Sequence, residues 1–183
     1  MVDEQDITLR CQQGDNDARR QIYESYAGWM LGVCFRYVGD REKAQDLMHD
    51  GMMQVFERIG SFQWKGEGSL KAWIFKVQQN IVLMYLRQHK RLEEELSIDE
   101  NPNIGEEPEP EGADDIPGKV IVQMIADLPI GYRTVFNMYV VDGLSHRQIA
   151  ETIGIKEKSS ASQLVHARQI LASKINEWRK NNQ

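Results

Sequence analysis

The stretch GLSHRQIAETIGIKEKSSASQLVHARQIL, residues 143–171, decides the fold of the second half of the chain. Apolar residues recur every three to four positions on each side of Gly154, which predicts two helices, His146–Ile153 and 157–178, joined by a tight glycine turn. This is a helix-turn-helix pattern, and the second helix of such a unit commonly enters the DNA major groove. A plain helical bundle with a polar outer face would give the same periodicity. The turn glycine and the serine-rich start of the second helix favour DNA reading over that alternative.

On a helical wheel, the second helix has a buried face and an outward face. The buried face consists of Leu164, Ala167, Leu171 and Ile175. The side broadly opposite carries Lys158, Ser159, Ser162, Val165, His166 and Gln169. Lys156 and Lys158 can meet phosphates, and small hydroxyl side chains early in the helix allow close approach to a groove. We therefore expect the outward face to contact DNA.

The distribution of charge explains how an acidic chain can bind DNA. The 183 residues carry a formal net charge of -6, with a pI near 5.3. Residues 93–115 hold 11 of the 28 acidic residues and no Lys or Arg, which leaves 22 basic and 17 acidic residues, a net charge of +5, elsewhere. Three of the five prolines also lie there, so we predict an acidic flexible linker over residues 93–116. It is either a mechanical tether or a screen that keeps two DNA-binding halves from indiscriminate contact with nucleic acid.

Composition excludes several classes of protein. The chain is 41% hydrophobic and 27% charged, which suits buried cores rather than general disorder. No apolar run approaches the roughly 18 residues of a membrane span, and the acidic N-terminus does not fit a signal peptide. Cys11 and Cys34 form no disulfide framework, and the four histidines show no zinc-ligand spacing. We expect a soluble, cytoplasmic protein with no metal, no cofactor and no small-molecule substrate.

Helical periodicity also dominates the first half of the chain. Helices are expected over residues 7–13, 17–38, 41–59 and 70–91, with Asp40 as the cap of the third. Two more are expected after the linker, over 119–127 and 131–141, and no alternating strand pattern appears. The predicted fold is all-α: two helical bundles, residues 1–92 and 117–183, joined by an acidic linker, with the helix-turn-helix in the second.

The long helix of the first bundle has two apolar strips and one polar edge. The strips are predicted to face the core and consist of Leu70, Trp73, Ile74, Val77, Ile81 and Met84, and of Phe75, Val82 and Leu86. The edge between them carries Lys76, Asn80 and Arg87. It is either a solvated face or a surface that grips phosphates and touches bases.

A glycine-rich loop precedes this helix and contains Trp64 and Lys65. An aromatic face beside a cation can hold an unstacked base, with about 1–3 kcal/mol for each stacked base. Alternatively, Trp64 is a core residue folded under the loop.

Three blocks of the sequence resemble parts of one known family. They are ARRQIYESYAGWMLGVCFRYVGDREKAQDLMHDGMMQVFERI, GSLKAWIFKVQQNIVLMYLRQHKR and LPIGYRTVFNMYVVDGLSHRQIAETIGIKEKSSASQLVHARQIL. In this order, and over about nine-tenths of the chain, they resemble a bacterial RNA polymerase sigma factor of the extracytoplasmic-function (ECF) group. The first block resembles the first part of the family's promoter-melting domain, the second its helix that reads the minus-ten element, and the third its minus-thirty-five domain.

The resemblance implies a role for each matching position. It implies docking on the clamp helices of the polymerase β′ subunit through Asp46, Gln54 and Glu57. It implies minus-ten contacts from Trp64, Lys65, Asn80, Arg87, Lys90 and Arg91, and we also expect a contact from Lys76 on the polar edge of the helix. It implies minus-thirty-five contacts from Ala161, Ser162, Val165 and His166, and we also expect contacts there from Arg147, Lys156, Lys158 and Ser159. The implied partners are core RNA polymerase, including the β flap, promoter DNA, and an anti-sigma factor, often membrane-bound.

Three positions depart from the family pattern. The family usually has Asp where this chain has Met84, and it often has basic residues at positions 161 and 166, here Ala and His. The second domain is therefore expected to have an unusual promoter preference.

Two other functions compete with this prediction. A stand-alone helix-turn-helix regulator would bind duplex DNA tightly without polymerase and would usually dimerise. A nucleic-acid enzyme would use the carboxylates between Asp40 and Glu57, but no catalytic or metal-ligand constellation accompanies them. The sequence favours a specificity subunit that catalyses nothing itself.

Overall fold

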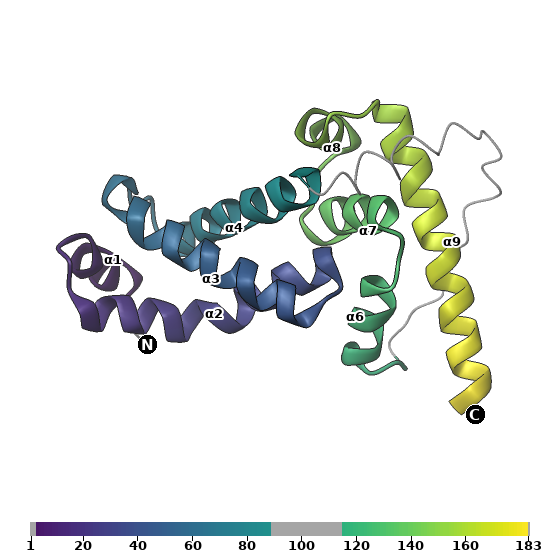
Figure 1. Cartoon of the computed structure of the whole chain (residues 1–183), viewed down its shortest axis with the longest axis horizontal. Coiled ribbons are helices and arrows are strands. Elements are labelled where there is room, and N and C mark those ends of the chain that lie inside the picture. Colours follow the sequence, from purple (N-terminus) through teal and green to yellow (C-terminus); the bar gives the residue numbers. More distant parts are fainter. Residues whose placement is uncertain (1–2, 89–114, 183) are drawn as a thin grey trace. The chain divides into compact units, whose positions relative to one another are not determined.

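The computed structural model describes residues 3–88 and 115–182, which form eight α-helices and no strand (Figure 1). The predicted all-α fold is confirmed. The chain divides into two compact units, Met1–Tyr85 (unit 1) and Leu86–Gln183 (unit 2). Lys90, Arg91 and most of the predicted linker lie outside the described residues, so nothing structural follows for them.

Unit 1 is built on four helices with clear local boundaries. They are α1 (Glu4–Gln12), α2 (Asn16–Val38), α3 (Arg41–Arg58) and α4 (Ser69–Gln88), with a short 3-10 turn, η1 (Ile59–Ser61), after α3. Asp15 caps α2 by accepting from the N–H groups of Asp17 and Ala18, and Gly39 ends α2 with a φ of 70°. Asp40 accepts from the N–H of Lys43 at 2.8 Å, so the predicted cap of α3 is confirmed.

A polar side chain, Gln78, joins three helices in the core of unit 1. Gln78 of α4 is fully buried and donates to Sγ of Cys34 on α2 at 2.9 Å and to the carbonyl of Leu47 on α3 at 3.0 Å. At Gly51 of α3, a Cβ would lie 1.9 Å from Oε1 of Gln78. A side chain at position 51 would therefore displace Gln78 from its hydrogen bonds, and glycine avoids that clash.

The predicted core strips of α4 are largely correct, with one error. Leu70, Ile74, Val77, Ile81, Val82 and Leu86 are buried, and Trp73 and Phe75 are half-buried. Met84 was predicted to lie in the core but is 49% exposed. Met84 lies just beyond the edge of the buried face of α4. At such an edge, the apolar character of a residue does not by itself show whether its side chain is buried.

Unit 2 consists of α6 (Gly118–Ala126), α7 (Ile130–Phe136), α8 (His146–Ile153) and α9 (Glu157–Asn182). The long helix α9 contacts each of the other three (Figure 1). The predicted helix over 131–141 has the expected extent but changes type. It begins at Ile130 after Pro129 and passes into a π-helical turn, η2, at Asn137–Val141. The side chain of Asn137 donates to the carbonyl of Arg133 at 2.9 Å. The ring of Tyr139, within the π turn, stacks on that of His146 at the start of α8, with 4.4 Å between centroids.

The last two residues of the predicted linker belong to the folded part of unit 2. Asp115 accepts from Nε and Nη2 of Arg179 near the end of α9, at 3.0 and 2.8 Å, and Ile116 is buried. The Arg179 guanidinium lowers the pKa of the Asp115 carboxyl, first through these hydrogen bonds.

Candidate nucleic-acid interface

An exposed stripe runs along α4. It consists of Ala72, Lys76, Asn80, Met84 and Arg87, all exposed, and we call it the α4 stripe. At 100° per residue these positions span an arc of about 120°. The structure therefore places Lys76, Asn80 and Arg87 on one surface, as the sequence predicted, and adds Met84 to them. Lys76 also donates to the side chain of Gln79 at 3.3 Å.

A pocket of about 410 Å³ lies at the first end of this stripe. Its walls are Ser61, Phe62, Gln63, Lys65, Ser69, Ala72 and Trp73. The rings of Phe62 and Trp73 lie 5.1 Å apart at an interplanar angle of 42°. Because Ala72 belongs to both features and Lys76 follows one helical turn later, the pocket adjoins the α4 stripe.

The two loop residues predicted from sequence differ in their relation to the pocket. Lys65 is exposed and lines it. Trp64 is 38% exposed, which does not fit a residue folded under the loop, but it is not among the wall residues. The aromatic walls are instead Phe62 and Trp73, which the sequence did not single out because apolar periodicity assigned Trp73 to the core.

An exposed stripe also follows α3, and it includes two residues that the sequence did not identify. Asp46, Asp50, Met53 and Glu57 are exposed and fall within an arc of about 60°, and we call them the α3 stripe. Met53, at 61% exposure, is a large apolar side chain among three carboxylates. Gln54 is half-buried and lies to one side of this arc. Asp46 pairs with Lys43 at 3.3 Å.

The helix-turn-helix of unit 2 has the predicted first helix, turn and start of the second helix, but α9 continues to Asn182 instead of ending at Trp178. Ser145 and Gln148 form a reciprocal capping box at the start of α8, which ends at Gly154 with a φ of 78°. That left-handed conformation is readily adopted only by glycine, so the tight turn between α8 and α9 depends on it. Ile149 and Ile153 face the core, while Arg147 is exposed and pairs with Glu151 at 3.2 Å.

The first turns of α9 only partly match the predicted outward face. Lys156 and Lys158 are exposed, and Ser159, Ala161 and Val165 are half-buried. Ser162, predicted to face outward, is only 8% exposed. The helical wheel predicted a narrow buried face for this helix. The buried face of α9 is wide and includes Ser160, Gln163 and Leu164 as well as Ser162, so the wheel placed Ser162 on the wrong side.

Two histidines of unit 2 are held by neighbouring side chains. The ring of His166, predicted to face outward, lies against that of Tyr132 on α7, with 5.5 Å between centroids. His146 Nδ1 lies 3.0 Å from the hydroxyl of Ser160, and burial lowers the pKa of His146. These contacts fix α9 against α7 and α8, and they reduce the access of His166 to DNA.

In the described part of the chain, no helix is long and apolar enough to cross a membrane, and no cluster of three His, Cys, Asp or Glu side chains could hold a metal ion. The exposed surfaces of unit 1 carry amide, basic and aromatic groups around α4, and carboxylates along α3.

Comparison with known proteins identifies both units. A family model of sigma-70 region 2 matches residues 22–92, and one of sigma-70 region 4 matches residues 119–171. The ECF RNA polymerase sigma-E factor of Haemophilus influenzae is 26% identical, over 94% of this chain and 95% of that protein. The ECF sigma factor SigM of Bacillus subtilis is also 26% identical, over 85% of this chain and 94% of that protein.

A solved structure shares the fold. The sigma factor RpoE of Bartonella quintana, in complex with the anti-sigma factor NepR, is 19% identical, with a TM-score of 0.50 over 86% of this chain and 96% of that chain. The family predicted from the three sequence blocks is confirmed. With both region models matched in order over most of its length, the chain belongs to the sigma-70 family, in the extracytoplasmic-function group of sigma factors that direct RNA polymerase to promoters.

Proposed function

We propose that unit 1 docks on core polymerase and traps the melted minus-ten element, and that unit 2 reads the minus-thirty-five element. The single observation that carries this division is the continuity of the aromatic pocket with the α4 stripe. A flipped base in the pocket would place the following phosphates along Lys76 and Arg87. Asn80 lies between these two residues in sequence, where an amide can contact a base edge.

The pocket suits an unstacked base. Phe62 and Trp73 offer aromatic surface, Lys65 offers a cation, and Ser61, Gln63 and Ser69 offer polar groups. Stacking on an aromatic side chain contributes about 1–3 kcal/mol per base. Trp64, exposed beside the pocket, is placed to stack on a neighbouring base.

In unit 2 we assign phosphate contacts to Lys156 and Lys158, with Arg147 as a further cation, and base contacts to Ser159, Ala161 and Val165. Lys156 and Lys158 flank the N-terminus of α9, where the helix dipole also attracts phosphate. Ser162 and His166 act mainly as supports, since one is buried and the other lies on Tyr132.

The proposed partners follow from the family. The α3 stripe is the surface for the β′ clamp helices, with Gln54 at its margin, and unit 2 contacts the β flap. The RpoE protein of Bartonella quintana is bound by an anti-sigma factor, which supports regulation of this chain by such a protein in a stress or envelope response. The chain acts in the cytoplasm and is a transcription initiation factor without a catalytic group of its own.

Reconstitution with core RNA polymerase tests the proposal. The chain is added to core enzyme and a library of promoter fragments, and transcripts are sequenced. Promoter-dependent initiation that requires both units is the expected result. Tight binding to duplex DNA as a dimer, with no effect on polymerase, would show a stand-alone regulator instead.

A further inference from the structure

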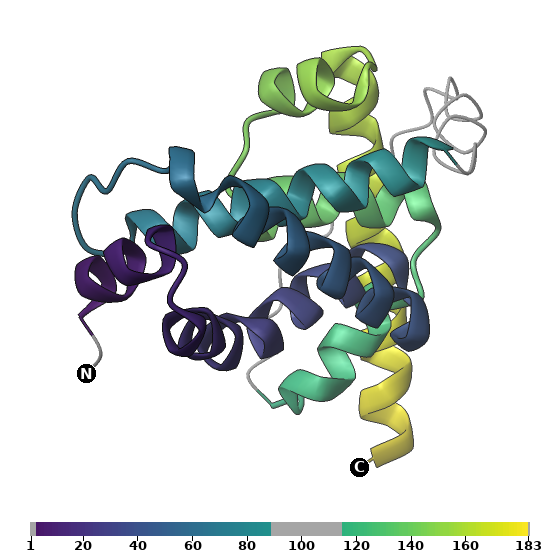
Figure 2. The same ribbon diagram turned by 60° about the vertical axis from the view of Figure 1, so that its left-hand side comes forward.

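The helix α1 lies against the loop that forms the pocket. The loop comprises residues 62–68 and connects η1 to α4. Figure 2 shows α1 beside the end of this loop that leads into α4. The helix lies outside the residues 22–92 that the region 2 model matches. Its contacts with the loop therefore join a helix outside the matched family domain to a loop within it.

Two side chains of α1 hold the two ends of this loop. Nε2 of Gln12 donates to the carbonyls of Ile59 and Phe62, at 2.9 and 2.8 Å, where the chain leaves α3 and enters the loop. Oε2 of Glu4 accepts from the N–H of Gly68 at 2.7 Å, where the loop returns to α4. Hydrogen bonds to an ionised group are the stronger kind, and this one is short.

Gly68 needs such a partner because of its conformation. Its φ is 82°, and that of Gly66 is 120°, so the loop passes through two backbone conformations that glycine adopts readily and other residues rarely. Flexible glycines lose much conformational entropy when they are fixed. A charged acceptor at the N–H of Gly68 offsets part of that cost and fixes the residue one position before α4.

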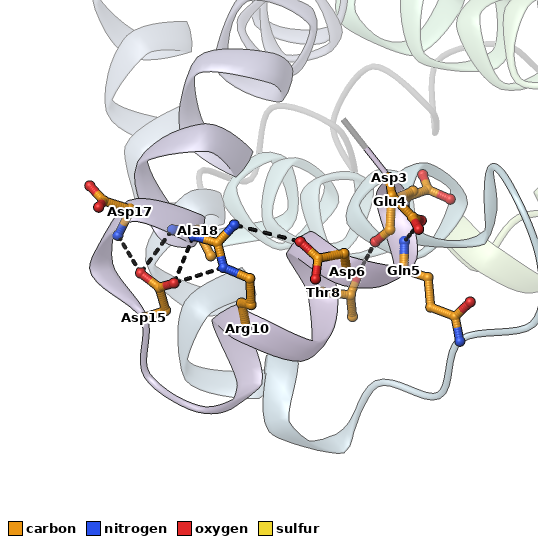
Figure 3. Close-up of polar contacts among 9 residues, drawn as sticks. All are labelled: Asp3, Glu4, Gln5, Asp6, Thr8, Arg10, Asp15, Asp17 and Ala18. Atoms are coloured by element: carbon orange, nitrogen blue, oxygen red, sulfur yellow. Dashed lines mark hydrogen bonds and ion pairs between the residues drawn. The ribbon is translucent and has the colours of Figure 1, made fainter. Parts of the chain in front are cut away.

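The helix α1 is itself firmly attached, so it can act as a rigid support. Oε1 of Glu4 accepts from the hydroxyl of Tyr26 on α2 at 3.1 Å. At the other end of α1, Arg10 pairs with Asp15, the cap of α2, at 2.7 Å (Figure 3). Ile7 and Cys11 are buried beneath the helix. Burial raises the pKa of Tyr26 to about 12, with the Glu4 hydrogen bond as a second cause, so the tyrosine stays a donor.

We propose that α1 is a clamp for the base-capturing loop, and that Glu4 and Gln12 are positioning residues for strand opening. They contact no DNA themselves. They hold Phe62 and Gly68, and thereby the wall formed by Phe62, Gln63 and Lys65, in the shape that accepts a flipped base. This inference rests on the proposed function of the pocket, but the clamp itself can be measured without polymerase.

The test uses the full chain with Glu4→Ala and Gln12→Ala, and with Gln5→Ala and Gln13→Ala as matched controls. The control residues are exposed neighbours on or next to α1. Hydrogen exchange of loop amides 63–68 reports the clamp in the isolated protein. Permanganate reactivity of thymines in the minus-ten element reports strand opening with core polymerase, and a binding titration reports core affinity.

Loss of one charge-assisted hydrogen bond should speed exchange at Gly68 about tenfold in Glu4→Ala. Strand opening should fall by about the same factor, while helical content and core affinity stay within twofold of the wild type. Glu4→Gln keeps an acceptor oxygen and should restore most of both. The control variants should match the wild type.

The outcomes separate this inference from the proposed function. A wild-type chain that opens no promoter, with exchange still faster in the two variants, contradicts the proposed function and leaves the clamp standing. Normal opening by both Glu4→Ala and Gln12→Ala, with a wild type that is active, overturns the positioning role. If Glu4→Ala loses helical content, Gln12→Ala alone tests the positioning role.

Discussion

The side-chain amide of Gln78 donates to the sulfur of Cys34 across 2.9 Å, at a point where three helices of unit 1 meet. Cys34 is on α2, Gln78 is on α4, and the second acceptor of the same amide is the carbonyl of Leu47 on α3. This hydrogen bonding ties α4, which carries the α4 stripe, to the two helices beneath it. The stability of the candidate interface therefore depends on a polar group in the core.

Gly51→Ala should destabilise unit 1 by about 1–3 kcal/mol, because the new methyl group would meet Oε1 of Gln78 and displace its hydrogen bonds. Chemical denaturation of the variant measures this. Gly28→Ala is the matched control, since that glycine lies on α2 with open space around it, and it should be neutral or stabilising. A loss in the control as large as that in Gly51→Ala would contradict the explanation.

Both cysteines should resist thiol reagents in the native protein. Burial raises the pKa of the Cys34 thiol to about 12 and also raises that of Cys11, so neither is a thiolate near pH 8. Because the raised pKa values return toward normal on unfolding, both thiols should react at that pH once denaturant is added. Rapid modification of either cysteine under native conditions would show that the core around it opens readily.

Trp64→Ala should weaken open-complex formation by about 1–3 kcal/mol, the loss of one stacked base, while closed-complex binding changes little. Lys65→Ala should weaken the same step, because it removes the cation beside the pocket. The reason is that both act after the strands separate. Lys71→Ala is the matched control, since this exposed lysine of α4 lies over Trp29, 5.2 Å from the ring centroid, and off the α4 stripe. If Lys71→Ala impairs opening equally, general positive charge rather than the pocket is responsible.

Charge reversal at Asp46 and Glu57, or Met53→Ala, should lower affinity for core polymerase about tenfold without changing helical content. The exposed Met53 lies within the α3 stripe, where an apolar side chain surrounded by carboxylates can anchor a partner. Gln45→Lys, on another side of α3, serves as the control. Unchanged affinity in a pull-down titration with all three changes would remove the α3 stripe as a docking surface.

Lys156→Ala and Lys158→Ala should weaken binding to all promoter sequences alike and lower the salt slope by about one each. Val165→Ala should instead change which upstream element is preferred, because a good base contact contributes about 1–3 kcal/mol of discrimination. Selection from a promoter library distinguishes the two effects. Ser162→Ala should leave the preference unchanged, since Ser162 is buried, and a shifted preference there would restore the base-reading role expected from sequence.

The sequence predicted the helices well because most boundaries are set locally. Asp40, Gly154 and the glycine-rich loop act through nearby backbone groups, and each was found where its residue type indicated. The edge of Lys76, Asn80 and Arg87 was also correct, since helical spacing alone fixes it.

The features that the sequence could not predict depend on distant segments of the chain. The pocket needs Phe62 and Trp73 to meet across a loop, and the α1 hydrogen bonds join residues more than 40 positions apart. The orientations of Met84 and Ser162 depend on how wide the buried face of each helix is, which neighbouring helices decide. No local pattern contains that information.

The π turn at Asn137–Val141 sets the phase of everything that follows it in unit 2. Such a turn holds one residue more than an α-helical turn, and Tyr139 within it stacks on His146, the first residue of α8. Deleting one residue within the π turn would remove the extra residue and restore regular helix, so the following chain would keep its orientation. Deleting one residue from the regular part of α7 would instead rotate the following chain by about 100° about the helix axis, and α8 would lose its packing register. The π turn is therefore a position at which this domain tolerates a change in length.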